Sequence, residues 1–443
     1  MEKYLMERIR YMKKNNSHEN VWLYWGTWNP NILTVSLWQE AMTSSVPKKM
    51  GLLLSGDLQC LGGRYYFLKN DFKRLENLLE KEGVVWLEKL AQHCDAEIKA
   101  LVQPADSFAD FLDRLPNFLG GLMLITFCDP WFEKKIREVC GQKKLDSESV
   151  LRSLQPKKKT LLLQYTAELE VLKKKDIDAF VEKWRWVGTH AFGGTLLTRE
   201  KVLRSFRLMQ KQKRNKRFTE EKINIQDTQL LRLMRIGQRL AFLRSNMVEE
   251  MNKAIFQHRE DMKIFAKRNK LRFAEISLLT HAEIKSLLDN KKIKRKINAG
   301  NFNCIAENGK IRISFGKMVN KHAVQRPESA KNINFITVKG TVACRGYARG
   351  RVRIVVSAAE SKRVRLGDIL IAPETTPDFI AAMQRAAAFV TDQGGITSHV
   401  AIIAREMNKP CIVGTKRTTQ IFHDGEMIEV DAHKGRIRKE LKY

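Results

Sequence analysis

The stretch TDQGGITSHVAIIAREMNKPCIVGT, residues Thr391–Thr415, sets a glycine pair and one histidine in front of a short apolar run. Gly394 and Gly395 predict a tight loop, because glycine tolerates positive φ and lets another group come close to the backbone. His399 would then stand at the first turn of the element that follows. This order of residues predicts a loop that presents one imidazole at the N-terminus of a helix.

The apolar residues after His399 recur at the spacing of a helix with one buried side. The expected buried stripe consists of Val400, Ile403, Ala404 and Met407. Thr397 or Ser398 can cap the first turn, since a hydroxyl oxygen accepts a hydrogen bond from a free backbone N–H. Pro410 should end the helix, because proline has no N–H to donate.

A histidine at a helix N-terminus lies among free N–H groups and at the positive end of the helix dipole. That field disfavours imidazolium and favours the neutral imidazole, which can attack phosphorus, and it stabilises the anion that results. The hydroxyls of Thr397 and Ser398 can donate to phosphate oxygens. A lone loop histidine is more often structural, so the interpretation of His399 depends on its context.

The segments GGITSHVAIIARE and NKPCIVGT closely resemble the signature of the phosphohistidine swivelling domain of the PEP-utilising enzymes. This family includes phosphoenolpyruvate synthase, pyruvate phosphate dikinase and rifampin phosphotransferase. Three further stretches resemble other strands and loops of that domain: GTVACRGYARGRVRIV (340–355), LGDILIAPETTPDF (366–379) and DGEMIEVDAHKGRIR (424–438). At Cys344-Arg345-Gly346 the chain departs from the family, which more often has serine and proline before the glycine.

The resemblance implies a role for each residue of the motif. His399 would carry a phosphoryl group, and the loop around it would bind the phosphate through Gly394, Gly395, Thr397 and Ser398. Arg405 and Glu406, a turn or more along the helix, are candidate docking or ion-pair residues. A solvated helix face is an equally good interpretation of these last two.

The remainder of the chain is predicted to be mostly helical, so the expected fold class is multidomain α+β with a C-terminal swivelling β/β/α domain. We expect a helical, substrate-binding-like region at residues 1–316, a linker at 317–335 and the swivelling domain at 336–443. The helical region resembles the substrate-binding region of rifampin phosphotransferase in order and pattern. In both, an arginine-bearing long helix precedes an Ile-Ser-Leu-Leu-Thr-like stretch, here Ile276–Thr280.

Local patterns predict several elements before that stretch. Asn70 or Asp71 can cap a helix that Gly83 interrupts. The apolar run 118–128 is too short to span a bilayer and is typical of a buried helix. Heptad-like spacing predicts a long helix from 226 to about 272, broken once, with arginines on the face opposite its apolar residues.

The segment 183–203 breaks the helical rhythm and sets a histidine among aromatic residues and a second glycine pair. A planar or hydrophobic substrate could be bound there. The candidate pocket residues are Trp184, Trp186, His190 and Phe192. A packed interdomain loop is the plainer alternative.

Composition limits the function only loosely. The chain has 443 residues and a formal net charge of +31, with basic residues along its whole length. Such a balance suits nucleic acid, an anionic surface or phosphorylated small molecules, and a lysine-rich proteome would also produce it. Seven cysteines without CxxC spacing argue against a disulfide framework and a zinc site, so we expect a cytoplasmic protein without a bound metal. We expect no membrane span.

In the related families an ATP-grasp domain charges the histidine, and the sequence shows no candidate for that domain. We therefore expect a phosphotransferase component whose His399 is charged by a separate ATP-grasp partner and which passes the phosphoryl group to a small-molecule acceptor. No cofactor would be tightly bound; ATP and magnesium would belong to the partner. The alternative is a non-catalytic regulatory or binding protein that uses the domain as a phosphorylatable switch. Binding of nucleic acid, driven by charge, is a third and less favoured hypothesis.

Overall fold

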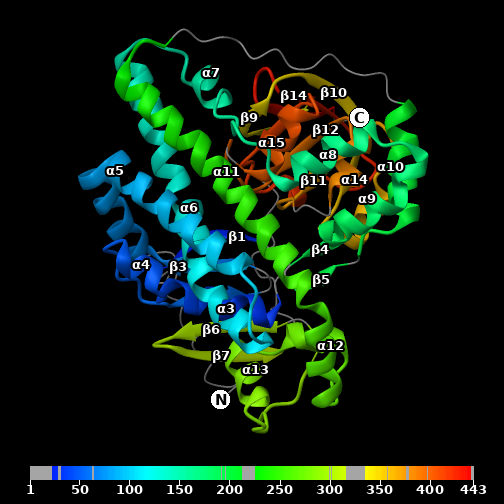
Figure 1. Ribbon diagram of the computed structural model, residues 1–443. Coiled ribbons are helices and arrows are strands. Elements are labelled where there is room, and N and C mark those ends of the chain that lie inside the picture. The colour runs from blue at the N-terminus through cyan, green and yellow to red at the C-terminus, as the bar shows by residue number, and fades with distance from the viewer. Residues whose placement is uncertain are drawn as a thin grey trace. The chain divides into compact units, whose positions relative to one another are not determined.

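The computed structural model describes residues 22–27, 31–61, 64–190, 192–194, 196–211, 225–298, 300, 302–315, 335–356, 358–375, 379–396 and 398–440. The chain divides into two compact units. Unit 1 comprises Met1–Trp131, Ala191–Gly193 and Ala254–Asn320, and unit 2 comprises Phe132–His190, Gly194–Lys253 and Lys321–Tyr443. Helices α6 (Phe108–Gln142) and α11 (Thr228–Gln257) contribute to both units (Figure 1). The linker expected at 317–335 lies almost wholly outside the described residues, so its boundaries stay a prediction.

Unit 1 holds an antiparallel sheet of five strands in the order β1-β3-β2-β6-β7. The strands are β1 (Trp22–Thr27), β2 (Leu58–Leu61), β3 (Arg64–Leu68), β6 (Phe302–Glu307) and β7 (Lys310–Phe315). Strands far apart in sequence meet here, because β2 pairs with β6 and sets Cys60 opposite Cys304. All seven cysteines of the chain are buried free thiols.

Five helices and a 3₁₀ turn accompany this sheet in unit 1. They are α3 (Ile32–Met42), α4 (Ser45–Lys49), α5 (Lys69–Val102), α12 (Arg259–Arg268), η3 (Phe273–Leu278) and α13 (His281–Leu288). Thr280 caps α13 by accepting from the backbone N–H of Glu283 at 3.1 Å. The buried His281 joins α13 to α3, since its Nδ1 lies 2.8 Å from Oε2 of Glu40 and its backbone N–H donates to Oγ of Ser36.

The predicted cap of α5 is wrong. The helix begins at Lys69, with Leu68 in the capping position, and Asp71 lies inside the first turn. The Asp71 carboxylate instead accepts from Oγ of Ser55 at 2.8 Å, which ties α5 to the segment before β2. The predicted interruption at Gly83 is confirmed, because its φ of 57° and ψ of −132° leave the helical region and kink the helix.

The apolar run 118–128 is buried helix, as predicted, and it forms the middle of α6. By length and composition alone α6 could cross a membrane, and it is the one helix among the described residues that could. Within its most apolar window, 72% of the residues are buried inside the protein. Burial of this kind is typical of a core helix.

The helical part of unit 2 packs around α11 and the end of α6. Its other elements are α7 (Ser147–Arg152), α8 (Leu161–Val171), η1 (Lys174–Asp176), α9 (Ile177–Trp184), η2 (Arg185–Gly188), β4 (Thr189–His190) and α10 (Arg199–Lys211). The two-residue strand β5 (Gly193–Gly194) lies at the boundary, with Gly193 in unit 1 and Gly194 in unit 2. The long helix predicted from 226 to about 272 is confirmed, with its break at His258 between α11 and α12. Glu249 of α11 is buried and accepts from the N–H of Leu162 at 3.0 Å, so it caps α8 across the fold. Burial raises the pKa of the Glu249 carboxyl to about 8.

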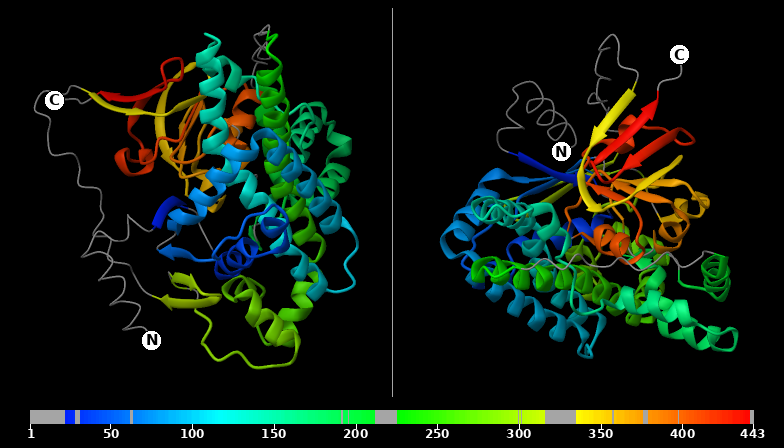
Figure 2. Two further views of the ribbon diagram at one scale, coloured as in Figure 1. Left: turned by 90° about the vertical axis from the view of Figure 1, so that its left-hand side faces the viewer. Right: turned by 90° about the horizontal axis from the view of Figure 1, so that it is seen from above.

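The C-terminal part of unit 2 is a mixed sheet of eight strands in the order β8-β15-β14-β10-β11-β12-β13-β9 (Figure 2). The strands are β8 (Phe335–Lys339), β9 (Thr341–Cys344), β10 (Tyr347–Ile354), β11 (Ile369–Ala372), β12 (Ala388–Thr391), β13 (Cys411–Val413), β14 (Met427–Asp431) and β15 (Arg436–Glu440). Neighbours from β10 to β13 run parallel, and the other pairs are antiparallel. The predicted α+β class, helical first and strand-rich last, is confirmed.

Burial follows from the strand sequences. β11 is apolar throughout, β12 is apolar up to Thr391, and both are buried, as parallel strands covered on both faces are. β10 alternates exposed and buried residues, so only one of its faces joins the core. The short elements η4 (Ala358–Arg363), α14 (Ile380–Arg385), α15 (His399–Glu406) and α16 (Thr418–Ile421) lie between these strands in sequence.

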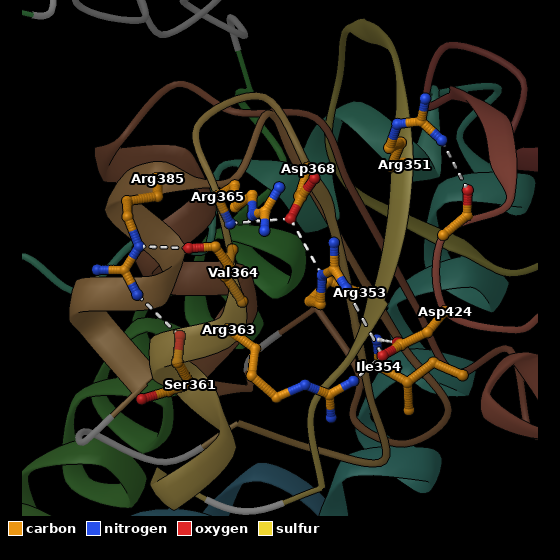
Figure 3. A network of polar contacts seen from close by, with 11 residues as sticks. Arg351, Arg353, Ile354, Ser361, Arg363, Val364, Arg365, Asp368, Arg385 and Asp424 are labelled. Carbon is orange, nitrogen blue, oxygen red and sulfur yellow. Dashed lines mark hydrogen bonds and ion pairs between the residues drawn. The ribbon is translucent and has the colours of Figure 1, made fainter.

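Two carboxylates organise the arginines near the start of β11 (Figure 3). Asp368 is buried and accepts from Nε of Arg353 at 3.2 Å and from the backbone N–H of Arg365 at 2.8 Å. Asp424 accepts from the backbone N–H of Ile354 at 2.6 Å and also bonds a guanidinium of η4, that of Arg363. These bonds join β10 to η4 and to the residues before β11.

We expect Gly83→Ala to lower the free energy of unfolding by about 1–3 kcal/mol, because a side chain is strained at φ of 57° although space surrounds it. Gly141→Ala is the matched control, since Gly141 ends α6 with ordinary φ and equal space. There alanine should gain up to about 1 kcal/mol. Urea unfolding measures both changes. Equal effects of the two substitutions would contradict the kink.

Candidate functional site

The candidate site is the loop between β12 and α15, at the carboxyl edge of the parallel strands. β12 ends at Thr391, the loop covers 392–398, and α15 begins at His399. Gly394 has a φ of +94°, so the predicted need for glycine at this turn is confirmed. Loops at the carboxyl ends of parallel strands commonly form ligand sites in α/β sheets.

Asp392 anchors the beginning of this loop. The buried Asp392 carboxylate accepts from Oγ1 of Thr415 at 3.1 Å and from the backbone N–H of Thr419 at 3.2 Å. Burial raises the pKa of this carboxyl, and the hydrogen bonds oppose the rise. A backbone hydrogen bond joins the same two segments, because Thr415 N donates to the carbonyl oxygen of Thr391 at 3.1 Å. The loop therefore has its own supports within the sheet domain.

Helix α15 starts where the sequence predicts and ends slightly earlier. Ser398 occupies the capping position, but its side chain makes no capping hydrogen bond, and its buried Oγ has no partner in the described part of the chain. The expectation that Pro410 ends the helix is wrong. Asn408 ends it by adopting a φ of 48°, and the N–H of Lys409 then donates to the carbonyl oxygen of Ala404 at 2.9 Å.

The two ring nitrogens of His399 have different surroundings. Nδ1 lies 3.4 Å from Oγ1 of Thr375, a buried residue that follows β11. Nε2 is buried and has no hydrogen-bond partner among the residues that the structure describes. In the tautomer that donates its Nδ1 proton to Thr375, the ring keeps a lone pair on Nε2.

The surroundings also keep the ring neutral. Burial, with a smaller contribution from the positive charge of Arg244, lowers the pKa of His399 from 6.5 to about 4. Arg244 belongs to α11, so the positive charge of this helix acts on the imidazole within unit 2. Neutral imidazole is the form that attacks phosphorus, and a nearby guanidinium is suited to the anion that such an attack produces.

A second side chain of the helical part reaches the same loop. Oε1 of Glu133, on α6, accepts from the backbone N–H of Ile396 at 3.2 Å. Gly395 permits this approach, because a Cβ there would lie 2.4 Å from the same oxygen. The predicted close approach at the glycine pair is therefore confirmed, and its partner is a carboxylate of α6.

Arg405 has a place that the sequence did not suggest. It is buried, and its guanidinium donates to the carbonyl oxygens of Ala343, at 2.9 Å, and Ile396. The alternative of a solvated helix face is wrong for Arg405, since its side chain ties α15 to β9 and to the histidine loop. Its docking role stays a prediction. Glu406 is exposed, and its docking role stays a prediction. Thr397 lies outside the described residues.

Two of the residues expected to line an aromatic pocket pack against each other. Trp184 and Trp186 are buried, with ring centroids 6.0 Å apart, and Trp184 also packs on Tyr165 at 5.6 Å. Nε1 of Trp184 donates to Oε2 of Glu168 at 2.9 Å. Such packing is typical of a core. The side chain of His190 is outside the description, and the buried Phe192 belongs to unit 1, so a pocket role for these residues stays a prediction.

Three residues near His399 were not singled out from the sequence. Thr375 lies in the stretch that resembles the Thr-Pro-Asp loop of the family, and that resemblance could have indicated it. Arg244 was one of several arginines on a helix face. Glu133 gave no signal, because a glutamate within a charged helical stretch is ordinary. Among the described residues, no group of three or more His, Cys, Asp or Glu could hold a metal ion.

Comparison with known proteins agrees with this geometry over the C-terminal part. A sheet domain with a histidine at the start of a helix after the third parallel strand defines a class of phosphoryl-carrying domains. Residues 364–435 match the family model "PEP-utilising enzyme, mobile domain". The chain therefore carries a mobile domain of the PEP-utilising enzymes.

The relatives are similar to a part of the chain. A probable phosphoenolpyruvate synthase of Archaeoglobus fulgidus is 40% identical over 134 residues, which are 29% of this chain and 18% of that protein. The phosphoenolpyruvate synthase of Pyrococcus furiosus is 45% identical over 104 residues, 24% of this chain and 13% of the relative. This chain thus spans less than a fifth of their length. A solution structure of Enzyme I covers 62% of this chain and 76% of its own, at 15% identity and a TM-score of 0.17.

The lowered pKa of His399 gives a pH dependence. Between pH 6.5 and about 4 the unfolded state binds a proton that the folded state excludes, so stability falls as the pH falls. We expect wild type to lose roughly 1–2 kcal/mol of unfolding free energy relative to His399→Gln between pH 7 and pH 5. Urea unfolding of both proteins measures the difference. A difference that does not change over this range would contradict a buried neutral ring.

Proposed function

We propose that the chain is a phosphotransferase component in which Nε2 of His399 carries a phosphoryl group. One observation carries the proposal: Nδ1 faces Thr375 at 3.4 Å, while Nε2 has no partner among the described residues and the ring is neutral. The match to the mobile domain of the PEP-utilising enzymes supports it. Relatives named phosphoenolpyruvate synthase support phosphoenolpyruvate and its chemistry as the metabolic setting.

Two in-line transfers would complete the cycle. In the first, the Nε2 lone pair attacks the phosphorus of a donor, the donor's P–O bond breaks, and the leaving oxygen keeps the electron pair. In the second, an acceptor oxygen attacks, the N–P bond breaks, and the pair returns to Nε2, while the acceptor's hydroxyl proton passes to water. Arg244 would neutralise the phosphoryl charge in the pose that the structure shows, and Thr375 would hold the ring.

The donor and the acceptor belong to this proposal as well. The donor would be a separate ATP-grasp protein that charges His399 from ATP and magnesium, and the acceptor would be a small molecule bound by the helical part of unit 2. The position of Arg244 supports the second point, because a cation of the helical part faces the carrier ring.

Labelling tests the carrier role. The full chain is incubated with ³²P-labelled phosphoenolpyruvate or ATP, each alone and with an ATP-grasp protein, and with phosphoramidate, a chemical phosphoryl donor that needs no partner. We expect a label that is lost in acid, survives alkali and maps to the peptide holding His399. His399→Ala should remain unlabelled. An equal label in that variant, or a label stable in acid, would contradict the proposal.

The role of Thr375 is tested by an isosteric pair. Thr375→Val removes the hydroxyl beside Nδ1, and we expect phosphoramidate to label His399 roughly 3–10-fold more slowly, the effect of one lost hydrogen bond. Thr375→Ser keeps the hydroxyl and should label within about twofold of wild type. If valine and serine behave alike, the hydroxyl does not orient the ring.

A further inference from the structure

The contact between α6 and the histidine loop is built on both sides. On one side, Oε1 of Glu133 accepts from the backbone N–H of Ile396 at 3.2 Å. On the other, the loop has a glycine at the position that this oxygen approaches, where a Cβ would lie 2.4 Å away. A hydrogen bond from a backbone N–H to a carboxylate is charge-assisted and stronger than a neutral one.

The loop does not depend on Glu133 for its own fold. Asp392 and Thr415 fix its first residues to the sheet, and the Arg405 guanidinium holds the carbonyl oxygen of Ile396 from within the same domain. Glu133 comes from outside that sheet domain, on a long helix shared with the rest of the protein. Its bond to the loop is therefore a docking contact between the domain and the helical part of unit 2.

In this docked arrangement the reactive nitrogen is enclosed. Nε2 of His399 is buried, as is Oγ of Ser398, and α11 brings Arg244 to the ring. Figure 1 shows α11 running past the helix that His399 begins. A phosphoryl donor arriving from solvent cannot reach Nε2 without displacing one of these elements.

We propose that Glu133 is the positioning residue that latches the histidine loop onto the helical part, and that this latch must open before His399 can be charged. The purpose of the latch rests on the proposed function, because the latch would separate the charging of His399 from the delivery of its phosphoryl group to the acceptor. Its existence as a docking contact rests on the geometry alone. Glu133 acts through the loop, because it accepts from the backbone N–H of Ile396.

A phosphoryl group would act on the same latch. It adds up to about two negative charges at the histidine, and the Glu133 carboxylate bears the same sign. Arg244 attracts that charge and Glu133 repels it, so the two helices α6 and α11 respond to phosphorylation in opposite directions. The charged and uncharged forms would then dock differently against one helical part.

The test measures access to His399 in the full chain. Diethyl pyrocarbonate acylates a neutral imidazole at an exposed nitrogen, and peptide mass spectrometry gives the rate at His399, with the exposed His433 as an internal standard. We expect Glu133→Ala to raise the His399 rate about tenfold or more, the effect of losing a charge-assisted hydrogen bond. Glu133→Gln keeps an accepting oxygen, so its His399 acylation rate should lie between those of wild type and Glu133→Ala.

Two further variants make the test specific. Gly395→Ala places a methyl group at the Glu133 oxygen and should raise the rate as Glu133→Ala does. The double variant should equal either single one, because both remove the same contact. Glu138→Ala is the matched control, since Glu138 lies on the same helix, is exposed and forms ion pairs with Lys134 and Lys135 of that helix.

The outcomes are decisive in either direction. A His399 rate in Glu133→Ala within twofold of wild type, or fully additive effects of the two substitutions, would overturn the latch. Far-UV circular dichroism and an unchanged His433 rate show that the variants remain folded. Phosphoramidate labelling at His399 should rise in the same order as acylation. If acylation follows this order and no phosphoryl label forms, the latch stands and the proposed function fails.

Discussion

One backbone turn determines the site. The positive φ of Gly394 directs the chain from the end of β12 into α15, which sets His399 at the carboxyl edge of the parallel strands. The sheet holds both ends of the turn, through Asp392 at its start and through Arg405, which bonds the carbonyl of Ile396, at its end. A histidine elsewhere on the same sheet would not lie beside Thr375, next to the loop that Glu133 contacts.

The chemistry depends on the different surroundings of the two ring nitrogens of His399. Thr375 lies beside Nδ1, and burial denies a partner to Nε2 within the described residues. Burial also removes the positive charge that would prevent attack, since it lowers the pKa of His399 to about 4. The same surroundings therefore set the charge of the His399 ring, its tautomer and the access of other molecules to Nε2. A movement of the domain away from α11 would alter all three.

Local signals predicted well where spacing alone decides structure. The start of α15, the kink at Gly83 and the long helix α11 all follow from patterns within about thirty residues of sequence. The sheet of unit 1 could not be predicted in this way, because β1 and β6 pair with strands from distant segments of the sequence. Arg405 was misplaced for a related reason: a charged residue on an amphipathic helix is normally solvated, and only the fold reveals the carbonyl oxygens it reaches.

The central claim is that Nε2 of His399 carries the phosphoryl group while Nδ1 is held. Nuclear magnetic resonance of the full chain, with ¹⁵N in its histidines and phosphoramidate as the donor, tests it most directly. We predict a ³¹P–¹⁵N coupling to Nε2 of His399 and none to its Nδ1. A coupling to Nδ1, or phosphorylation of other histidines with His399 unmodified, would contradict the account.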